Sequence, residues 1–425
     1  MQVSLILGLL AVLQIISGLA GQLIVLRLVG VGLQTDAYIA AQTVPNILFS
    51  VVAASLHSLW LPRLSRAAQE PASFREEVRA AQGQCLTVMA LTCAGLWLSS
   101  FAWVSIAFPG FGPAQSNLVV LLSTPLFIQT ALMAHTGILT AALRARGRFL
   151  VAEVSGLTLS VVGIVLLFWL VPYLGIVAAA WIAAGRAAIV LVVLSVYCGM
   201  PGFCLRSSAS GREVAGQIRS LVGSGLFIKS GPLVDRFWSS QGSAGSVTVL
   251  SMAQLAINSL ATVLERALLV HITPQFARYV RDGNFSELRS LYVSSLLRIG
   301  GGVAAVGALF MFGRPIVDWL LQSLLLLSPA AASEVWLICL VLLPSLFVAI
   351  SGSAAVAVFY AFGETRLPSL IGLGGFMLSV ALKALLFWSH GIVGLAAAAS
   401  ICFTMTMIVY HAAVMRRIAA ATKTD

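Results

Sequence analysis

The sequence predicts an all-α integral membrane protein of about twelve transmembrane helices, built as two six-helix lobes related by a pseudo-twofold axis. Of its 425 residues, 60% are hydrophobic and only 9% are charged, which leaves too little polar surface for a water-soluble protein of this size. Apolar runs long enough to cross a hydrocarbon layer of about 30 Å recur along the whole chain. The two halves also resemble each other, which indicates a duplication.

The apolar runs predict twelve spans, at residues 4–26, 37–61, 84–108, 117–143, 150–171, 174–199, 217–240, 246–272, 290–312, 335–361, 367–388 and 391–415. The seventh run is the least regular, because Lys229, Asp235 and Arg236 interrupt it. The connections between the runs are too short to fold a core of their own, so no separate soluble domain is expected.

The duplication appears when the chain is shifted against itself. A shift of 212 residues aligns Ala41/Ala253, Gln42/Gln254, Asn46/Asn258, Leu48/Leu260, Val51/Val263, Leu56/Leu268, Pro62/Pro274 and Arg66/Arg278. Further along, a shift of 216 residues aligns Gly147 with Gly363 and residues 175–177 with residues 391–393. The matches include polar residues, prolines and glycines, which an apolar composition alone does not produce. The Gly/Ser/Arg-rich stretch 201–211 is the natural linker, which predicts lobes at 1–205 and 206–425.

The net charge of +11 is explained by membrane topology rather than by a nucleic-acid partner. Basic residues follow the even-numbered spans, at Arg63, Arg66, Arg75, Arg79, Arg144, Arg146, Arg148, Arg206, Arg212, Arg278, Arg281, Arg289, Arg366, Arg416, Arg417 and Lys423. The odd-numbered connections carry little beyond Arg27 and Arg314. By the positive-inside rule, both termini and all the basic loops are expected in the cytoplasm.

Sequence motifs of catalysis are missing. The chain has no P-loop, no HExxH and no GxSxG motif, and its six cysteines show no CxxC spacing. We therefore expect a transporter and not an enzyme, with no catalytic residue, no metal site and no cofactor. Transport is expected to draw on the membrane potential or on a gradient of H⁺ or Na⁺.

Ionisable residues inside the spans are candidates for function, because each costs about 2.5–3.5 kcal/mol to insert. Arg27, Arg186 and Arg236 are candidates to contact an anionic substrate group, and Asp36 and Asp235 to couple an ion or to orient those cations. For residues 235 and 236, an interhelical ion pair or snorkelling to the interface is an equally good interpretation.

Two further groups of polar residues stand out. Glu265 and Arg266 lie near the predicted cytoplasmic end of the eighth span, where a gate or a structural ion pair is expected. Gln42 with Asn46, and Gln254 with Asn258, are i,i+4 pairs that share one helical face in each half. Such neutral amides can bind sugar hydroxyls or phosphate oxygens, and they can equally act as hydrogen-bonding contacts between helices.

Four stretches resemble the MurJ/MviN flippases of the multidrug/oligosaccharidyl-lipid/polysaccharide exporter superfamily. They are RLVGVGLQTDAYIAAQTVPN (27–46), TAALRARGRF (140–149), GSVTVLSMAQ (245–254) and FYAFGETRLP (359–368). The resemblance runs in collinear order over nearly the whole chain and implies a MATE-like fold, in which spans one, two, seven and eight line a central cavity. It further implies a protein of the bacterial cytoplasmic membrane that moves a lipid-linked saccharide by alternating access.

The sequence departs from the lipid II branch of that family at several cavity positions. Arg27 and Asp36 match the branch, but its charged positions on spans one, two and eight are here Gly21, Thr43, Phe49, Ser50, Leu255 and Asn258. The two additional C-terminal helices of that branch have no counterpart in this sequence. We therefore expect the head group to be an exopolysaccharide or O-antigen unit on a polyprenyl (pyro)phosphate rather than the peptidoglycan precursor.

Several other functions remain open at this point: a lipid II flippase proper, a cation-coupled multidrug exporter of the same superfamily, a membrane glycan polymerase, or a non-transporting scaffold. A polymerase usually carries a large extracytoplasmic loop with basic residues, which is not seen here. The expected partners are the polyprenyl-linked saccharide, membrane lipids and glycan-synthesis proteins.

Overall fold

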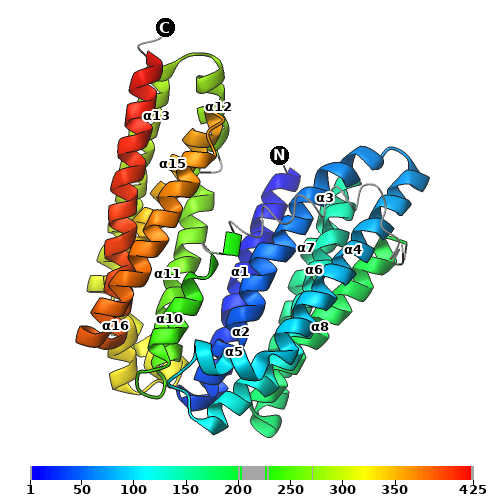
Figure 1. The fold of residues 1–425 in the computed structure, drawn as a ribbon, viewed down its shortest axis with the longest axis vertical. Helices are drawn as coiled ribbons and strands as arrows, with labels where there is room; N and C mark the ends of the chain where they lie inside the picture. The colour runs from blue at the N-terminus through cyan, green and yellow to red at the C-terminus, as the bar shows by residue number, and fades with distance from the viewer. Residues whose placement is uncertain (1, 200–201, 203–224, 227–228, 270, 423–425) are drawn as a thin grey trace. The chain divides into compact units, whose positions relative to one another are not determined.

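The computed structural model describes residues 2–199, 202, 225–226, 229–269 and 271–422 (Figure 1). The chain divides into two compact units, Met1–Val247 and Thr248–Asp425, called unit 1 and unit 2 below. The predicted lobe boundary between residues 205 and 206 lies outside the described residues and stays a prediction.

Both units are helical throughout their described parts. Unit 1 contains α1 (Gln2–Val29), α2 (Leu33–Leu48), the π-helix η1 (Phe49–Ala53), α3 (Ala54–Ala67), α4 (Pro71–Leu98), α5 (Ser100–Ala107), α6 (Pro113–Ala145), α7 (Phe149–Leu174), α8 (Ile176–Tyr197) and α10 (Gly231–Ser239). Next come α11 (Ser246–Leu269), α12 (Thr273–Arg281), α13 (Phe285–Phe312), α14 (Arg314–Trp319), the π-helix η2 (Leu320–Leu324), α15 (Pro329–Ala361) and α16 (Arg366–Thr422). The unit boundary falls in the first turn of α11.

The predicted spans correspond closely to long apolar helices. Ten helices in the described residues are long and apolar enough to cross a membrane, and α16 is two helices joined at Gly391. The all-α membrane fold is therefore confirmed. The first part of the seventh predicted span, 217–240, lies outside the described residues, and its described end contains α10.

The third span begins and ends earlier in the chain than predicted. Instead of running to residue 108, α4 ends at Leu98 and the separate helix α5 follows. The hydroxyl of Ser99 donates to the carbonyl oxygen of Gly95 (2.8 Å) and to that of Leu96 (3.3 Å). Hydroxyl bonds of this kind form within helices as well as at their ends, and hydropathy alone does not reveal where α4 ends.

The backbone repeats with the predicted period of 216 residues. Helices α6 and α15 begin and end at equivalent positions and are both 33 residues long. Each ends before a glycine with positive φ, at Gly147 (φ 73°) and Gly363 (φ 76°). The next helix in each unit is interrupted at Gly175 (φ 68°) and Gly391 (φ 57°). Left-handed backbone favours glycine, so these four matches reflect a shared chain path.

The largest part of the unit 1 core is buried where α3 and α4 pack against α6. Trp60 is completely buried there, together with Leu56, Leu64 and Ile138. In unit 2, α12, α13 and α16 pack against α15. Large apolar side chains that face outward, such as Phe312 and Trp388, suit a surface in contact with lipid.

Candidate functional site

Asp36 is held at the start of α2 by the local backbone and by a distant glycine. The Thr35 hydroxyl accepts from the N–H of Gly32 and donates to the carbonyl oxygen of Gly32 (3.0 Å each), which fixes the start of the helix. Asp36 is 2% exposed, and its Oδ2 accepts the N–H of Gly245 at 2.7 Å. Its place in the first turn of α2 also favours a carboxylate, because the helix dipole is positive there.

The partner of Asp36 has to be glycine. Gly245 has a φ of +94°, and a Cβ at this position would lie 2.7 Å from Cγ1 of Val31. Both the backbone conformation and the space therefore exclude a side chain. The bond joins residues 209 positions apart, and residue 245 immediately precedes α11.

Helix α10 adds two more charges to this region. It packs against α2 and α5, and Asp235 and Arg236 are 6% and 8% exposed. Arg236 interacts electrostatically with both Asp235 and Asp36. A buried guanidinium between two carboxylates compensates part of the cost of removing each charge from water. The structure thus brings together three of the residues predicted to contact the substrate or to couple an ion.

Arg186 belongs to a second polar group in unit 1. It is half-buried on α8, and its Nη1 donates to Oγ of Ser160 on α7 at 3.3 Å. Its stem lies beside Gly163, where a Cβ would be 3.3 Å from Cδ of Arg186. The guanidinium also interacts with Tyr38, which is within hydrogen-bonding reach of Gln42. Arg186 and the predicted amide Gln42 are therefore connected through α2.

Tyr38 was not among the residues predicted from the sequence, although a signal for it exists. It stands four residues before Gln42, so it lies on the face of α2 that carries the first amide pair. An aromatic residue with a hydroxyl at that spacing could have been included in the predicted site.

The remaining predicted residues lie on more open surfaces. Arg27 is exposed in the last turn of α1. The two amide pairs match each other in exposure, since Gln42 and Gln254 are half-buried while Asn46 and Asn258 are exposed. Equivalent residues thus have equivalent burial in the two units, although contact of these amides with sugar stays a prediction.

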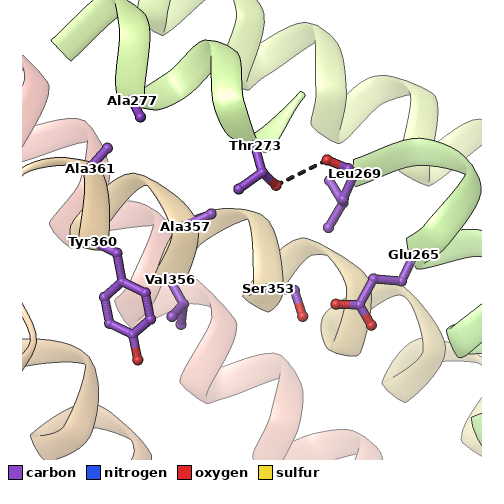
Figure 2. Close-up of a pocket in the computed structure, with 9 residues that line it drawn as sticks. All are labelled: Glu265, Leu269, Thr273, Ala277, Ser353, Val356, Ala357, Tyr360 and Ala361. Carbon is purple, nitrogen blue, oxygen red and sulfur yellow. Dashed lines mark hydrogen bonds between the residues drawn. The ribbon is translucent and has the colours of Figure 1, made fainter. Parts of the chain in front are cut away.

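The polar face of α11 continues beyond its amide pair. Counted at 100° per residue, Gln254, Asn258, Thr262 and Glu265 fall within about 80° of the helix circumference, and Arg266 lies beside them. This stripe reaches an open groove of about 570 Å³ in unit 2. Glu265, Leu269, Thr273, Ala277, Ser353, Val356, Ala357, Tyr360 and Ala361 line the groove (Figure 2). The predicted gate or ion pair of Glu265 and Arg266 stays a prediction.

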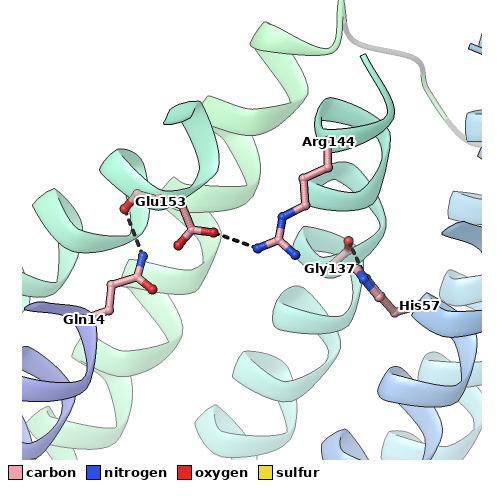
Figure 3. A network of polar contacts seen from close by, with 5 residues as sticks. All are labelled: Gln14, His57, Gly137, Arg144 and Glu153. Carbon is pink, nitrogen blue, oxygen red and sulfur yellow. Dashed lines mark hydrogen bonds and ion pairs between the residues drawn. The ribbon is translucent and has the colours of Figure 1, made fainter. Parts of the chain in front are cut away.

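Unit 1 has polar contacts at the equivalent place. Nδ1 of His57 on α3 donates to the carbonyl oxygen of Gly137 on α6 at 3.0 Å, and we call this contact the closed seam. Beside it, Arg144 pairs with Glu153 at 2.7 Å, and Gln14 donates to the carbonyl oxygen of Glu153 at 2.9 Å (Figure 3). These bonds tie α1, α3, α6 and α7 together.

A family model described as lipid II flippase MurJ matches residues 25–424. No curated protein sequence matches the chain.

Solved structures with the same fold cover 97% of this chain. A lipid II flippase MurJ in an inward closed conformation has a TM-score of 0.82 at 13% identity, with 87% of its length covered. An inward-facing multidrug resistance transporter of the MATE family has a TM-score of 0.80 at 17% identity, with 96% covered. A transporter of the MOP superfamily from Pyrococcus furiosus has a TM-score of 0.63 at 15% identity, with 95% covered. At these identities the likeness shows the fold.

Proposed function

The chain belongs to the MurJ family of lipid II flippases, and from this premise we propose that it moves a polyprenyl-(pyro)phosphate-linked saccharide across the bacterial cytoplasmic membrane. Transport proceeds by alternating access and forms no covalent intermediate. The family match over residues 25–424 carries this proposal. The buried charges of unit 1 support it, because ionisable groups in a membrane span are retained mainly where they serve transport or binding.

Within this function, each predicted polar group has a distinct role. Arg236 provides positive charge for the (pyro)phosphate, and Asp235 and Asp36 orient it. The carboxylate of Asp36 already accepts the N–H of Gly245, which suits an orienting group better than an ion ligand. Arg186 offers a second cation beside Gln42, and the exposed Asn46 and Asn258 meet sugar hydroxyls. Arg27 contacts the substrate anion from the end of α1.

The saccharide is proposed to be an exopolysaccharide or O-antigen unit, with lipid II as the alternative. Thr43 and Ser50 stand at positions where the lipid II branch is basic, and their hydroxyls donate to the carbonyl oxygens of Ile39 and Ile47 (3.0 Å each). Side chains that are satisfied within their own helix offer little to an anionic head group. Both termini are proposed to be cytoplasmic, and the driving force to be the membrane potential or a gradient of H⁺ or Na⁺.

A reconstitution experiment tests the proposal. Purified protein in liposomes is given fluorescent lipid II and, separately, an undecaprenyl-pyrophosphate-linked O-antigen unit, and the appearance of each head group on the other side is followed over time. Translocation of at least one substrate is expected, with loss of the rate in the Asp235→Ala/Arg236→Ala double variant. The matched control is the exposed Arg278→Ala variant, which should transport normally.

Two results would count against the proposal. Folded wild-type protein that moves neither substrate refutes the flippase function. Normal transport by the double variant refutes the assignment of the buried charges to the substrate.

A cation-coupled multidrug exporter is the second candidate, favoured by the TM-score of 0.80 to a multidrug resistance transporter. Efflux of ethidium by the same proteoliposomes under a proton or sodium gradient, without movement of either lipid-linked saccharide, would establish it instead.

A further inference from the structure

The groove in unit 2 lies at a break between two helices. Helix α11 ends at Leu269 and α12 begins at Thr273, and α12 packs against α15. Figure 2 shows Glu265 at one end of the groove and Tyr360 at the other, with Ser353, Val356 and Ala357 of α15 between them. Its volume of about 570 Å³ is within the range of pockets that hold small ligands.

The lining combines a carboxylate, hydroxyls and an aromatic ring on a floor of small residues. Glu265 is half-buried, and the Tyr360 side chain is 59% exposed at the rim. The Thr273 hydroxyl donates to the carbonyl oxygen of Leu269 at 3.0 Å, and the Ser353 hydroxyl donates to that of Ala349 at 3.2 Å, which leaves the carboxylate of Glu265 as the main acceptor of the lining. A carboxylate accepts strong hydrogen bonds from hydroxyl or amide donors, and an aromatic face packs against apolar surface.

A smaller recess of about 340 Å³ adjoins the groove. Thr262, Glu265, Arg266, Leu269 and Thr273 line it, so the two spaces share three residues. The exposed side chain of Arg266 places a positive charge at this recess. The carboxylate of Glu265 and the guanidinium of Arg266 therefore lie on or beside the polar face of α11 that also carries Gln254 and Asn258.

The residues that line the groove differ from those at the repeat-equivalent positions of unit 1. By the two sequence registers, Leu269 corresponds to His57 and Ser353 corresponds to Gly137, and in unit 1 these positions form the closed seam. Glu265 corresponds to Ala53, which is buried.

A further difference between the units lies at the rim of the groove. Tyr360 corresponds to Arg144, which is bound to Glu153. Glu265 and Tyr360 thus present a carboxylate and an aromatic ring where unit 1 has a buried alanine and a paired arginine, and Leu269 lacks the hydrogen bond that His57 makes.

We propose that this groove is a sugar subsite that takes one ring of the carrier-linked saccharide on the side of the membrane that bears the basic loops. Glu265 accepts hydrogen bonds from the ring substituents, and Tyr360 covers an apolar face of the ring. The carboxylate disfavours phosphate in the groove itself, which fixes the direction of the head group. This inference rests on the proposed function and adds to it a place where the sugar is bound.

Binding to full-length protein in nanodiscs tests the subsite with two probes. One is undecaprenyl-pyrophosphoryl-N-acetylglucosamine, and the other is undecaprenyl pyrophosphate without a sugar. Glu265→Gln and the space-filling Ala357→Phe should each weaken binding of the first probe about tenfold, as expected for the loss of one charge-assisted hydrogen bond, and leave the second unchanged.

Matched controls separate the groove from its surroundings. Glu364→Gln changes a carboxylate that follows α15 and pairs with Arg417, and Ala412→Phe enlarges an exposed alanine of α16. Neither residue lines the groove, so both variants should bind both probes normally. Tyr360→Leu changes an exposed side chain, and it should weaken binding of the first probe even if Ala357→Phe fails to fold.

Three outcomes would overturn the subsite. Equal weakening for both probes would assign the groove to the carrier, and no weakening by Glu265→Gln and Tyr360→Leu would mean that the groove does not bind the sugar. A loss of binding that appears only as a change in sodium dependence would assign Glu265 to an ion instead. If these variants bind normally while the wild type transports lipid-linked saccharide, the subsite alone fails. If the wild type transports neither saccharide, the proposed function fails.

Discussion

The closed seam of unit 1 and the groove of unit 2 occupy equivalent places in two copies of one helical design. Helices α6 and α15 provide the same wall in each copy, with the same length and the same glycine after the last turn. In unit 1, α3 packs along that wall and His57 bonds to it. In unit 2, Leu269 has no polar group to offer, and space remains. A few side chains therefore decide whether a duplicated helix pair is a structural contact or a ligand-sized opening.

The helices that face α6 and α15 differ in the position of an equivalent proline. In unit 1, the chain passes from α2 through η1 into α3 without a break, and Pro62 lies inside α3. In unit 2, the equivalent Pro274 stands in the first turn of α12, where its missing N–H costs nothing. The π-helix η1 follows Pro45, whose equivalent is Ile257. An inserted π-turn is a known way to re-aim the helix beyond it.

The largest expected effect comes from the core behind the closed seam. Trp60 is completely buried in unit 1, and its Nε1 donates to Oε1 of Gln84 at 2.9 Å. Trp60→Ala should lower the free energy of unfolding by about 3–5 kcal/mol, the usual cost of emptying such a site. The measurement is equilibrium unfolding of the purified protein in mixed micelles, followed by circular dichroism.

Two further variants, one at the equivalent residue of unit 2 and one at an exposed residue, test whether the loss of stability is specific to the buried site of unit 1. The equivalent residue in unit 2 is the smaller Ile272, and Ile272→Ala should cost about 2 kcal/mol. Trp169 is 74% exposed on α7, and Trp169→Ala should change stability by less than about 0.5 kcal/mol. If Trp60→Ala lowered the free energy of unfolding no more than Trp169→Ala, the core behind the closed seam would not contribute the stability proposed for it.

Accessibility to a thiol reagent should distinguish the two places next. Cysteines are introduced at Ser353 in the groove and at its equivalent Gly137, where a Cβ would lie 3.8 Å from Nδ1 of His57. A hydrophilic maleimide should label the Ser353→Cys protein roughly tenfold faster than the Gly137→Cys protein, because a thiol at residue 137 would lie against His57 whereas residue 353 lines the open groove. The background protein carries Cys204→Ser, since residue 204 lies outside the described residues.

The native cysteines should not obscure that measurement. The five described ones are buried. Burial raises the pKa of the Cys198 thiol to about 11, so it is protonated at pH 7.5 and stays so at pH 9. Raising the pH to 9 should therefore speed labelling in the groove and leave the background unchanged. Equal labelling rates at the two positions would mean that the seam opens as readily as the groove.

The sequence predicted the fold well because its main features are local. Apolar length predicts a span, and a glycine that permits positive φ predicts where it ends, as at Gly175 and Gly391. Local signals also had limits. Hydropathy carried the third span past Leu98, because residues 100–107 of α5 are as apolar as the end of α4.

The site was only partly predictable because its geometry depends on distant pairings. Intramembrane charge identified Asp36, Asp235 and Arg236 separately, but their grouping requires α10 to lie against α2. The bond from Asp36 to Gly245 spans 209 residues and involves a backbone N–H, which no side-chain pattern reveals. Glu265 was interpreted from its own helix alone, whereas the groove that it lines exists only because α15 presents small residues opposite.

The smallest expected effect concerns the helix break that opens the groove. The Thr273 hydroxyl donates to the carbonyl oxygen of Leu269, which also accepts the N–H of Ile272 at 3.1 Å, so the hydroxyl adds a second hydrogen bond at the end of α11. In unit 1 the equivalent residue is Leu61, which has no hydroxyl, and there the helix continues. Thr273→Leu should therefore cost about 0.5–1.5 kcal/mol, the net value of one hydrogen bond.

Thr273→Ser keeps the hydroxyl and is the matched control for that substitution. Hydrogen exchange of residues 266–273 should rise in the leucine variant and stay near the wild-type level in the serine variant, because only the former loses the bond that holds the end of α11. Faster exchange in both variants would assign the effect to the lost methyl group rather than to the hydrogen bond. Unchanged exchange in both would mean that Pro274 alone sets the break, since proline at the start of a helix is compatible with a stop just before it.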